Sequence, residues 1–316
     1  MKRIEQIVRL TSNEKYGQAA PPRPLGEILR LLPVAVSRAL RMSFEGRSTA
    51  SGPIPGWLHR MSDIRLVEYT GKTDTRLHFA CPTVGEAAPE LFEQQEFGWT
   101  EKPHHDDTGF DILGDVVSDL TSHNADSERF DRPMLQYLAH FRRAINGTFQ
   151  EIAFSGHRLS PQPPSVINES VIKTATEFSS ETPRSEPARV VGKLDMIRAS
   201  TQAFAIKLDS GDEVRGVMLN GDIGSLSQML AKRVLVLGKA IYRPSGRLLR
   251  IDAENVQQTS ENDTFFSKMP SPSRRRLDVR QIVREQSQKR GVAAIIGKWP
   301  GDETDDVIAE ALQELS

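Results

Sequence analysis

The chain has 316 residues, a length that suits about two domains and a tail. Its content of 38% hydrophobic and 26% charged residues is ordinary for a folded protein, and its net charge of −1 argues against a protein that coats nucleic acid over its whole surface. Cys81 is the only cysteine, which excludes an intrachain disulfide and a cysteine-based zinc site. No apolar run has the length of a membrane span, and the first residues lack the apolar core of a secretory signal. We therefore expect a cytoplasmic bacterial protein that does not enter a membrane.

Residues 1–158 are predicted to form an α+β domain of unknown role. A helix is expected to begin near Pro24 and to break or kink at Pro33, because proline removes a helical hydrogen bond. The leucine, methionine and phenylalanine of 39–45 alternate with polar residues and indicate a strand, and two further alternating segments predict a hairpin. The other elements expected here are the hairpin strands 63–69 and 75–81, helices over 85–95, 108–120 and from Asp131 onward, and a returning strand over 148–154.

Metal-capable side chains in this domain do not predict a metal site. The run His-His-Asp-Asp at 104–107 is consecutive, and adjacent side chains of an extended loop point in opposite directions. Asp111, Asp115 and Asp119 have helical spacing and would share one face, which is more often a solvated face than a cation site. Cys81, at a strand end, is predicted to be a buried structural thiol. We find no phosphate loop and no nucleophile or zinc-protease motif, so we expect no enzymatic activity and no cofactor.

A helix and a linker are expected over 159–187, followed by a small all-β unit over 188–257. The unit reads as three strands, a helix that begins at Asp222, and two more strands. This order is the signature of a five-stranded Greek-key barrel of the OB type. Barrels of this type have no chemistry of their own and bind oligonucleotides, oligosaccharides or proteins on one face. The predicted strands are 189–198, 203–208, 213–218, 233–242 and 247–253.

The basic surplus of the chain lies in this predicted barrel. Residues 189–256 contain 11 Lys or Arg and 7 Asp or Glu, a net charge of +4. Single-stranded nucleic acid is bound by cations that follow its phosphates and by aromatic rings that stack on its bases. A solvated charged face on a protein-binding barrel is the alternative, and the sequence leaves both open. The residues of the predicted nucleic-acid site surround the last turn: Lys239, Tyr242, Arg243, Arg247 and Arg250.

The last part of the chain is predicted to be a flexible linker over 258–276 and a helical tail over 277–316. The linker is rich in Ser, Pro and Arg. In the tail, Asp302 or Thr304 can cap a helix with one apolar side. This apolar side either docks on the chain itself or enters the groove of a partner. The residues predicted to contact a partner are Trp299, Ile308, Leu312 and Leu315.

The segment 296–305, Ile-Gly-Lys-Trp-Pro-Gly-Asp-Glu-Thr-Asp, resembles the C-terminal segment of short bacterial antitoxin-like proteins that accompany PIN-domain ribonuclease toxins. The resemblance covers about the last 25 to 40 residues and implies a peptide that wraps the toxin and blocks its acidic metal site. The preceding 260 residues do not resemble a short antitoxin.

The sequence thus predicts an α+β protein: a mixed N-terminal domain, an OB-like barrel and a helical tail. We expect a non-enzymatic binding or regulatory protein whose tail engages a protein partner, in an antitoxin-like neutralisation of a nuclease toxin. The alternative is single-stranded nucleic-acid binding through the barrel. A third hypothesis makes the first domain an enzyme that uses Asp111, Asp115 or the loop at His104.

Overall fold

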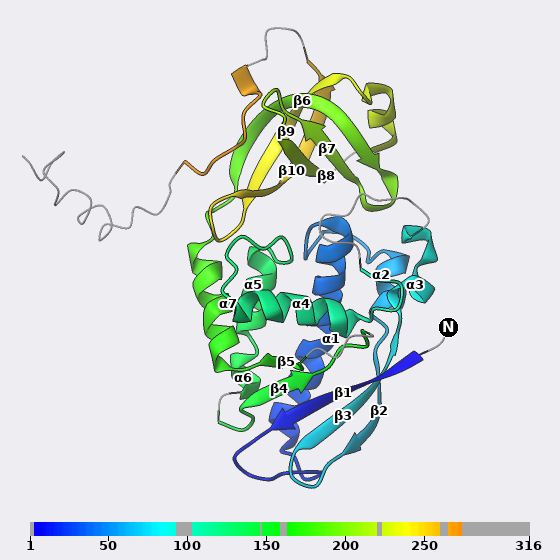
Figure 1. Cartoon of the computed structure of the whole chain (residues 1–316), viewed down its shortest axis with the longest axis vertical. Helices are drawn as coiled ribbons and strands as arrows, with labels where there is room; N and C mark the ends of the chain where they lie inside the picture. The colour runs from blue at the N-terminus through cyan, green and yellow to red at the C-terminus, as the bar shows by residue number, and fades with distance from the viewer. Residues whose placement is uncertain are drawn as a thin grey trace, which may run out of the picture. The chain divides into compact units, whose positions relative to one another are not determined.

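The computed structural model describes residues 3–92, 103–145, 147–158, 163–219, 223–259 and 265–273. It has the predicted α+β class, with a mixed sheet-and-helix region and a closed five-stranded barrel (Figure 1). The first sheet has the strand order β2-β3-β1-β4-β5, and all of its pairs are antiparallel. Its strands are β1 (Arg3–Thr11), β2 (Arg65–Thr70), β3 (Thr75–Pro82), β4 (Glu151–Phe154) and β5 (Ser165–Ile167).

The central strand of this sheet is β1, which the sequence analysis did not predict. It pairs with β3 from Arg3 opposite Pro82 to Leu10 opposite Thr75, and with β4 on its other side. Its side chains alternate between exposed and buried positions, with Val8 and Leu10 fully buried. The predicted β2–β3 hairpin and the returning strand β4 are confirmed.

One long helix, α1 (Pro22–Glu45), corrects two predictions. Pro33 lies inside α1 and does not end it, and 39–45 is helical rather than extended. The alternation of apolar and polar residues over 39–45 suggested a strand with one exposed face. In the helix the polar residues Arg41 and Glu45 are buried as well and form an ion pair. Helical turns that are buried on most sides lose the periodic pattern by which sequence reveals a helix, and the last turns of α1 are of this kind.

Two further helices begin at or next to their predicted starts. Helix α4 (Gly109–Thr121) begins with a capping box in which the Thr108 N–H donates to the Asp111 carboxylate at 2.8 Å. Asp131 caps the next helix by accepting from the Met134 N–H at 3.1 Å, as predicted. The predicted helix over 85–95 consists, in its described part, of two short turns. The remaining helical elements are α2 (Gly56–Met61), α3 (Val84–Ala87), η1 (Pro89–Leu91), α5 (Arg132–Ala139), α6 (Arg142–Ile145) and α7 (Glu169–Glu181).

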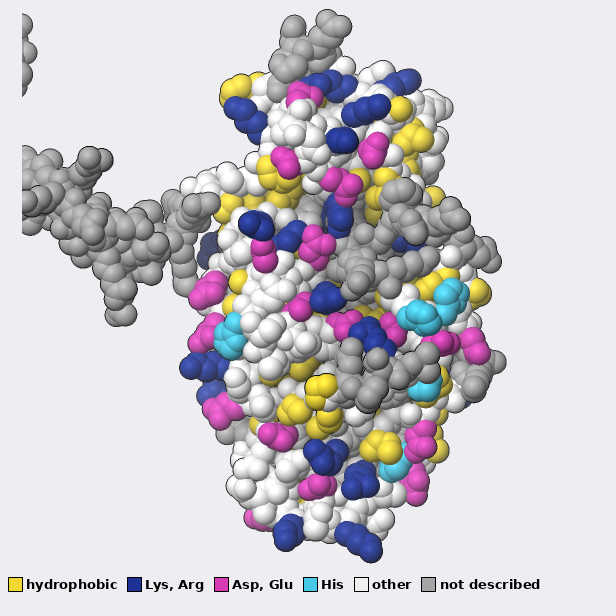
Figure 2. Space-filling model, in the orientation of Figure 1, with side chains coloured by type: hydrophobic (Ala, Val, Ile, Leu, Met, Phe, Trp, Pro, Cys, Tyr) yellow, Lys and Arg dark blue, Asp and Glu magenta, His cyan; other side chains and the backbone are white. Residues whose placement is uncertain are grey.

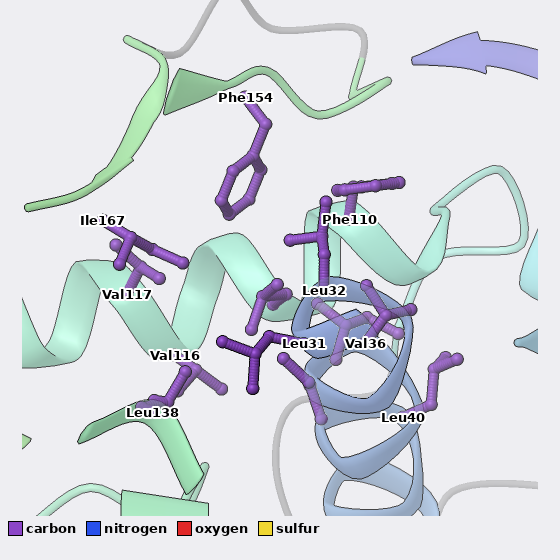
Figure 3. Packing of buried hydrophobic residues seen from close by; sticks show 14 of the residues in the cluster. Leu31, Leu32, Val36, Leu40, Phe110, Val116, Val117, Leu138, Phe154 and Ile167 are labelled. Atoms are coloured by element: carbon purple, nitrogen blue, oxygen red, sulfur yellow. The ribbon is translucent and has the colours of Figure 1, made fainter. Parts of the chain in front are cut away.

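Helices and sheet share one hydrophobic core (Figure 3). Leu31, Leu32 and Val36 of α1 belong to the same buried cluster as Phe110 of α4 and Phe154 of β4. All five side chains are at most 1% exposed. This burial offsets the cost of a proline inside α1, about 3 kcal/mol in a helix interior.

The barrel closes in the strand order β10-β8-β7-β6-β9. Strands β8 and β10 pair in parallel and every other pair is antiparallel, a mixed closure compatible with an OB-type barrel. The helical element between the third and fourth strands is present as a 3₁₀ turn, and the barrel has its own core. The elements are β6 (Glu186–Arg198), η2 (Ala199–Thr201), β7 (Ala203–Lys207), β8 (Glu213–Met218), η3 (Ile223–Met229), β9 (Arg233–Tyr242) and β10 (Leu248–Gln258).

No helix in the described ranges is both long enough and apolar enough to cross a membrane. Of the predicted linker, residues 258–259 and 265–273 are described. The predicted helical tail, with Trp299, Ile308, Leu312 and Leu315, lies outside the described residues, as does Asp222.

Candidate functional site

The turn between β9 and β10 carries two of the predicted nucleic-acid-binding arginines. Its backbone is closed by a hydrogen bond from the Arg243 N–H to the Arg247 carbonyl at 2.8 Å. Gly246 adopts a φ of 84°, which favours glycine, and Pro244 precedes it with its restricted φ. The turn is therefore rigid and holds the two arginine side chains at one end of the barrel.

These arginines meet the acidic loop 124–131 that follows α4. Arg243 donates to the Asp126 carbonyl at 2.8 Å and to the Glu128 carboxylate at 2.5 Å. Arg247 is paired with the Asp126 carboxylate. Arg215 of β8 donates to the other Glu128 oxygen at 3.0 Å. Residues 1–273 form one compact unit, and in it the acidic loop neutralises this end of the barrel.

Arg250 lies deeper and is 5% exposed. It donates to the Gly46 carbonyl, which follows α1, at 2.9 Å and to Asp131 at 3.3 Å. Its Nε donates to Asp252 at 2.7 Å. Asp131 also accepts hydrogen bonds from both the N–H and the hydroxyl of Ser48. Arg250 is thus a buried link between the barrel, the end of α1 and the start of α5.

The placement corrects the expectation that the five predicted residues share a basic groove with an aromatic platform. Tyr242 is 2% exposed and burial raises the pKa of its phenol, so the ring offers no face to a base. Arg243 and Arg250 are largely buried against carboxylates. Only Lys239 and Arg247 have side chains that are more than half exposed, and Arg247 is already bonded to Asp126.

A second polar cluster surrounds Arg158, which the sequence analysis did not single out. Its guanidinium donates to Asp107 at 3.1 and 3.2 Å and to Asp115 at 2.6 and 2.8 Å. These bonds raise the pKa of Arg158, so it remains charged. A cavity of about 180 Å³ lies beside it, lined in part by His104 and Arg129. No local sequence pattern predicts this cluster, because Arg158 is 51 and 43 residues away from the two carboxylates that it binds.

The predicted acidic row on α4 does not converge on one point. Asp111 serves the capping box and accepts from the His157 N–H at 2.6 Å. Asp115 binds Arg158, and Asp119 accepts from the Ser127 hydroxyl and from Arg129. Within the described part of the chain, no three His, Cys, Asp or Glu side chains are grouped so as to hold a metal ion.

Two further features bear on chemistry. Cys81 is buried as predicted, and burial raises the pKa of its thiol to about 12, so the thiol is protonated at neutral pH. A larger cleft of about 620 Å³ lies along α7, with the apolar side chains of Phe149 and Ile172 among charged ones from Arg142 and Lys173.

Comparison of the chain with protein-family models, with curated proteins and with solved structures finds no match. The function is therefore argued from the residues of this chain alone.

Proposed function

We propose that this protein is a non-enzymatic binding protein of the bacterial cytoplasm, whose C-terminal segment 277–316 engages a protein partner. The partner class we propose is a PIN-type nuclease toxin, neutralised in an antitoxin-like manner. Support for the class comes from the sequence of 296–305, and the apolar contacts are assigned to Trp299, Ile308, Leu312 and Leu315.

The observation that carries the proposal is the attachment of the chain just before this segment. Ser273 donates from its N–H at 3.0 Å and from its hydroxyl at 2.5 Å to the Glu186 carboxylate at the start of β6. Ser267 accepts from the Asp209 N–H at 2.9 Å. The chain that leads into the segment is therefore held on the barrel, which suits a barrel that acts as a support for a binding peptide.

The placement of the turn arginines also favours a supporting role for the barrel. Arg243 and Arg250 form ion pairs with carboxylates of the sheet-and-helix region, and Tyr242 is buried. A nucleic-acid site made of these residues and Lys239 would require these internal bonds to break. We therefore propose protein binding first, and the alternative of nucleic-acid binding needs a different surface of the barrel.

The test is retention of a partner by the affinity-tagged full chain, compared with a chain that lacks 278–316. The partner is a PIN-domain ribonuclease expressed together with the protein, and its RNA cleavage is measured in parallel. We expect the full chain to retain and inhibit the nuclease and the shortened chain to do neither, with unchanged thermal unfolding of the remainder. Retention and inhibition by the shortened chain would refute the proposal.

Point variants locate the contact. Trp299→Ala removes the largest apolar side chain of the segment and is expected to weaken binding by about 2 kcal/mol or more, as buried tryptophans at interfaces do. Gln313→Ala, outside the predicted apolar side, is the matched control and should bind as the unaltered chain does. Equal binding by both variants would move the contact away from the apolar side.

A further inference from the structure

A second basic surface on the barrel is built by strand register rather than by a turn. Lys193 of β6 lies directly opposite Lys207 of β7 on one side and directly opposite Arg233 of β9 on the other. Side chains that are directly opposite in antiparallel strands project from the same face of the sheet, with Cβ atoms about 5 Å apart. Lys193 and Lys207 are exposed, and their strand neighbours Leu194 and Ile206 are buried in the barrel core. The three cations therefore form a row on the outer face of the barrel, which we call the cationic row.

The charges of the cationic row are only partly neutralised. Arg233 is bonded to Asp209 at 2.6 and 2.8 Å. Among the described residues, neither Lys193 nor Lys207 has a side-chain hydrogen bond or ion pair. Glu213 of β8 lies directly opposite Lys207, but its carboxylate accepts from Arg215 at 2.9 Å. Lys232, next to Arg233, is exposed as well. Like charges directly opposite each other in a sheet are destabilising. An anionic ligand would relieve this repulsion, and Figure 2 shows Lys and Arg side chains gathered over the barrel in the upper part of the view.

An exposed aromatic ring is tethered beside the cationic row. The Asp209 residue that binds Arg233 also donates its N–H to the Ser267 hydroxyl at 2.9 Å. This bond fixes the segment that carries Phe265, which is 72% exposed. Lys268, also exposed, lies over the Phe265 ring at 5.0 Å from its centroid. An exposed ring among cations is the arrangement on which the bases of single-stranded nucleic acid stack.

We propose that the cationic row and Phe265 form a binding site for single-stranded nucleic acid. Lys193 and Lys207 would contact successive phosphates, with Arg233 held beside them by Asp209, while a base stacks on Phe265. An acidic peptide would use the cations but has no flat base for the ring, so the ring favours nucleic acid. Cations and a ring do not read base edges, so the binding is expected to tolerate different sequences. The site does not depend on the tail or on its proposed partner.

The experiment measures fluorescence anisotropy of labelled oligo-U and oligo-dT, each of about 16 nucleotides, the upper site size for one barrel. The full chain is titrated at about 50 and about 200 mM salt. We expect binding that weakens steeply with salt. In the double variant Lys193→Gln with Lys207→Gln, affinity at low salt should fall about tenfold or more and the slope of log affinity against log salt should fall by about 1.4, or 0.7 for each lost phosphate contact.

A control variant makes the result specific. Lys72→Gln with Lys173→Gln removes the same charge from two exposed lysines outside the barrel and should change the affinity little. Phe265→Ala should weaken binding about tenfold with an unchanged salt slope, because it removes a stacked base and no phosphate contact. Deletion of 278–316 should leave the binding intact.

Three results would overturn the proposal. One is the absence of binding at low salt, and another is an equal loss of affinity in the row and control variants. The third is displacement of the labelled oligonucleotide by polyglutamate as readily as by unlabelled oligonucleotide, which would assign the row to an acidic protein. Unchanged thermal unfolding of the variants ensures that a loss of binding reflects the site.

Discussion

The barrel has two basic regions, and they differ in what neutralises their charge. At the β9–β10 turn, Arg243 and Arg247 are bonded to the acidic loop 124–131, and Arg250 is buried against Asp131. In the cationic row, Lys193 and Lys207 face each other and neither has an ion pair among the described residues, because Glu213, opposite Lys207, is paired with Arg215. The first region links the barrel to the acidic loop and to α1, whereas the two lysines of the second region have no such link.

The comparison shows why a count of charges along a sequence does not locate a binding site. The arginines of the turn were the more conspicuous in sequence because they are close together and adjoin a tyrosine. Their carboxylate partners come from a loop more than 100 residues earlier. The row is assembled from three separate strands, so only the register reveals it.

The largest expected effect tests the structural role of the turn region. Asp131→Ala removes a carboxylate that is 1% exposed and leaves Arg250 with less compensation for its buried charge. Breaking a buried ion pair from one side costs about 3–5 kcal/mol, and we expect the free energy of unfolding in urea to fall by that amount.

The control for this prediction is Asp126→Ala. Its carboxylate is 37% exposed and paired with the exposed Arg247, so the loss should be at most about 1 kcal/mol. If the Asp131 variant lost no more than the Asp126 variant, the buried link would not support the fold.

A smaller effect is expected for Arg243→Met. The side chain is 17% exposed, and it donates to both the backbone and a carboxylate of the acidic loop. Hydrogen bonds to charged groups contribute about 1.5–3 kcal/mol, and a loss in that range should appear in urea unfolding. Arg247→Met, with a side chain 75% exposed, should lose less than about 1 kcal/mol. A larger loss of stability for Arg247→Met than for Arg243→Met would contradict the finding that Arg243 is the more buried of the two.

The cationic row should respond in the opposite direction. Lys193→Gln with Lys207→Gln relieves the repulsion of two cations directly opposite each other. We expect the free energy of unfolding to stay the same or to rise by about 0.2–1 kcal/mol, measured in low salt where repulsion is least screened. A clear loss of stability would mean that these lysines have a structural role like that of the turn arginines.

Sequence predicted the barrel better than the region before it. The bounds of β8 and β9 match the prediction, because short strands between turn residues leave a clear pattern. The same method failed at α1, a 24-residue helix, because Pro33 lies inside it and its last turns bury Arg41 and Glu45 together with apolar residues. It also failed at β1, whose place at the centre of the sheet depends on pairing with a distant β3.

The candidate sites show the same limit. Tyr242 was predicted at the surface because tyrosine beside arginine is typical of stacking sites, but strand alternation turns it inward. Asp111, Asp115 and Asp119 were correctly placed along one helix, yet their partners, such as Arg158 and Arg129, come from other segments. Local pattern gives the position of a side chain on its element, and tertiary pairing decides what that side chain does.

The smallest expected effect concerns Asp209, the carboxylate bonded to Arg233 in the cationic row. The hydrogen bond from Arg233 lowers the pKa of Asp209. A carboxylate with a lowered pKa stays ionised above the unfolded value of about 3.9 and loses its contribution only as the pH falls through the folded value. Asp209 therefore holds Arg233 equally well at pH 7 and pH 5.

We expect Asp209→Asn to bind oligonucleotide more tightly than the unaltered chain, because it removes a negative charge and frees Arg233. The salt slope should increase by about 0.7, or one added phosphate contact. The ratio of the two affinities should be the same at pH 7 and pH 5, since every other titrating group is common to both proteins and largely cancels in the ratio. The unaltered carboxylate becomes protonated only as the pH falls through its lowered pKa, below the usual value of about 3.9, and the two affinities should then converge. If the ratio of affinities already falls between pH 7 and pH 5, Arg233 does not keep Asp209 ionised in that range. Asp209 would then not neutralise Arg233 at these pH values, and the charge assigned to this end of the cationic row would be wrong.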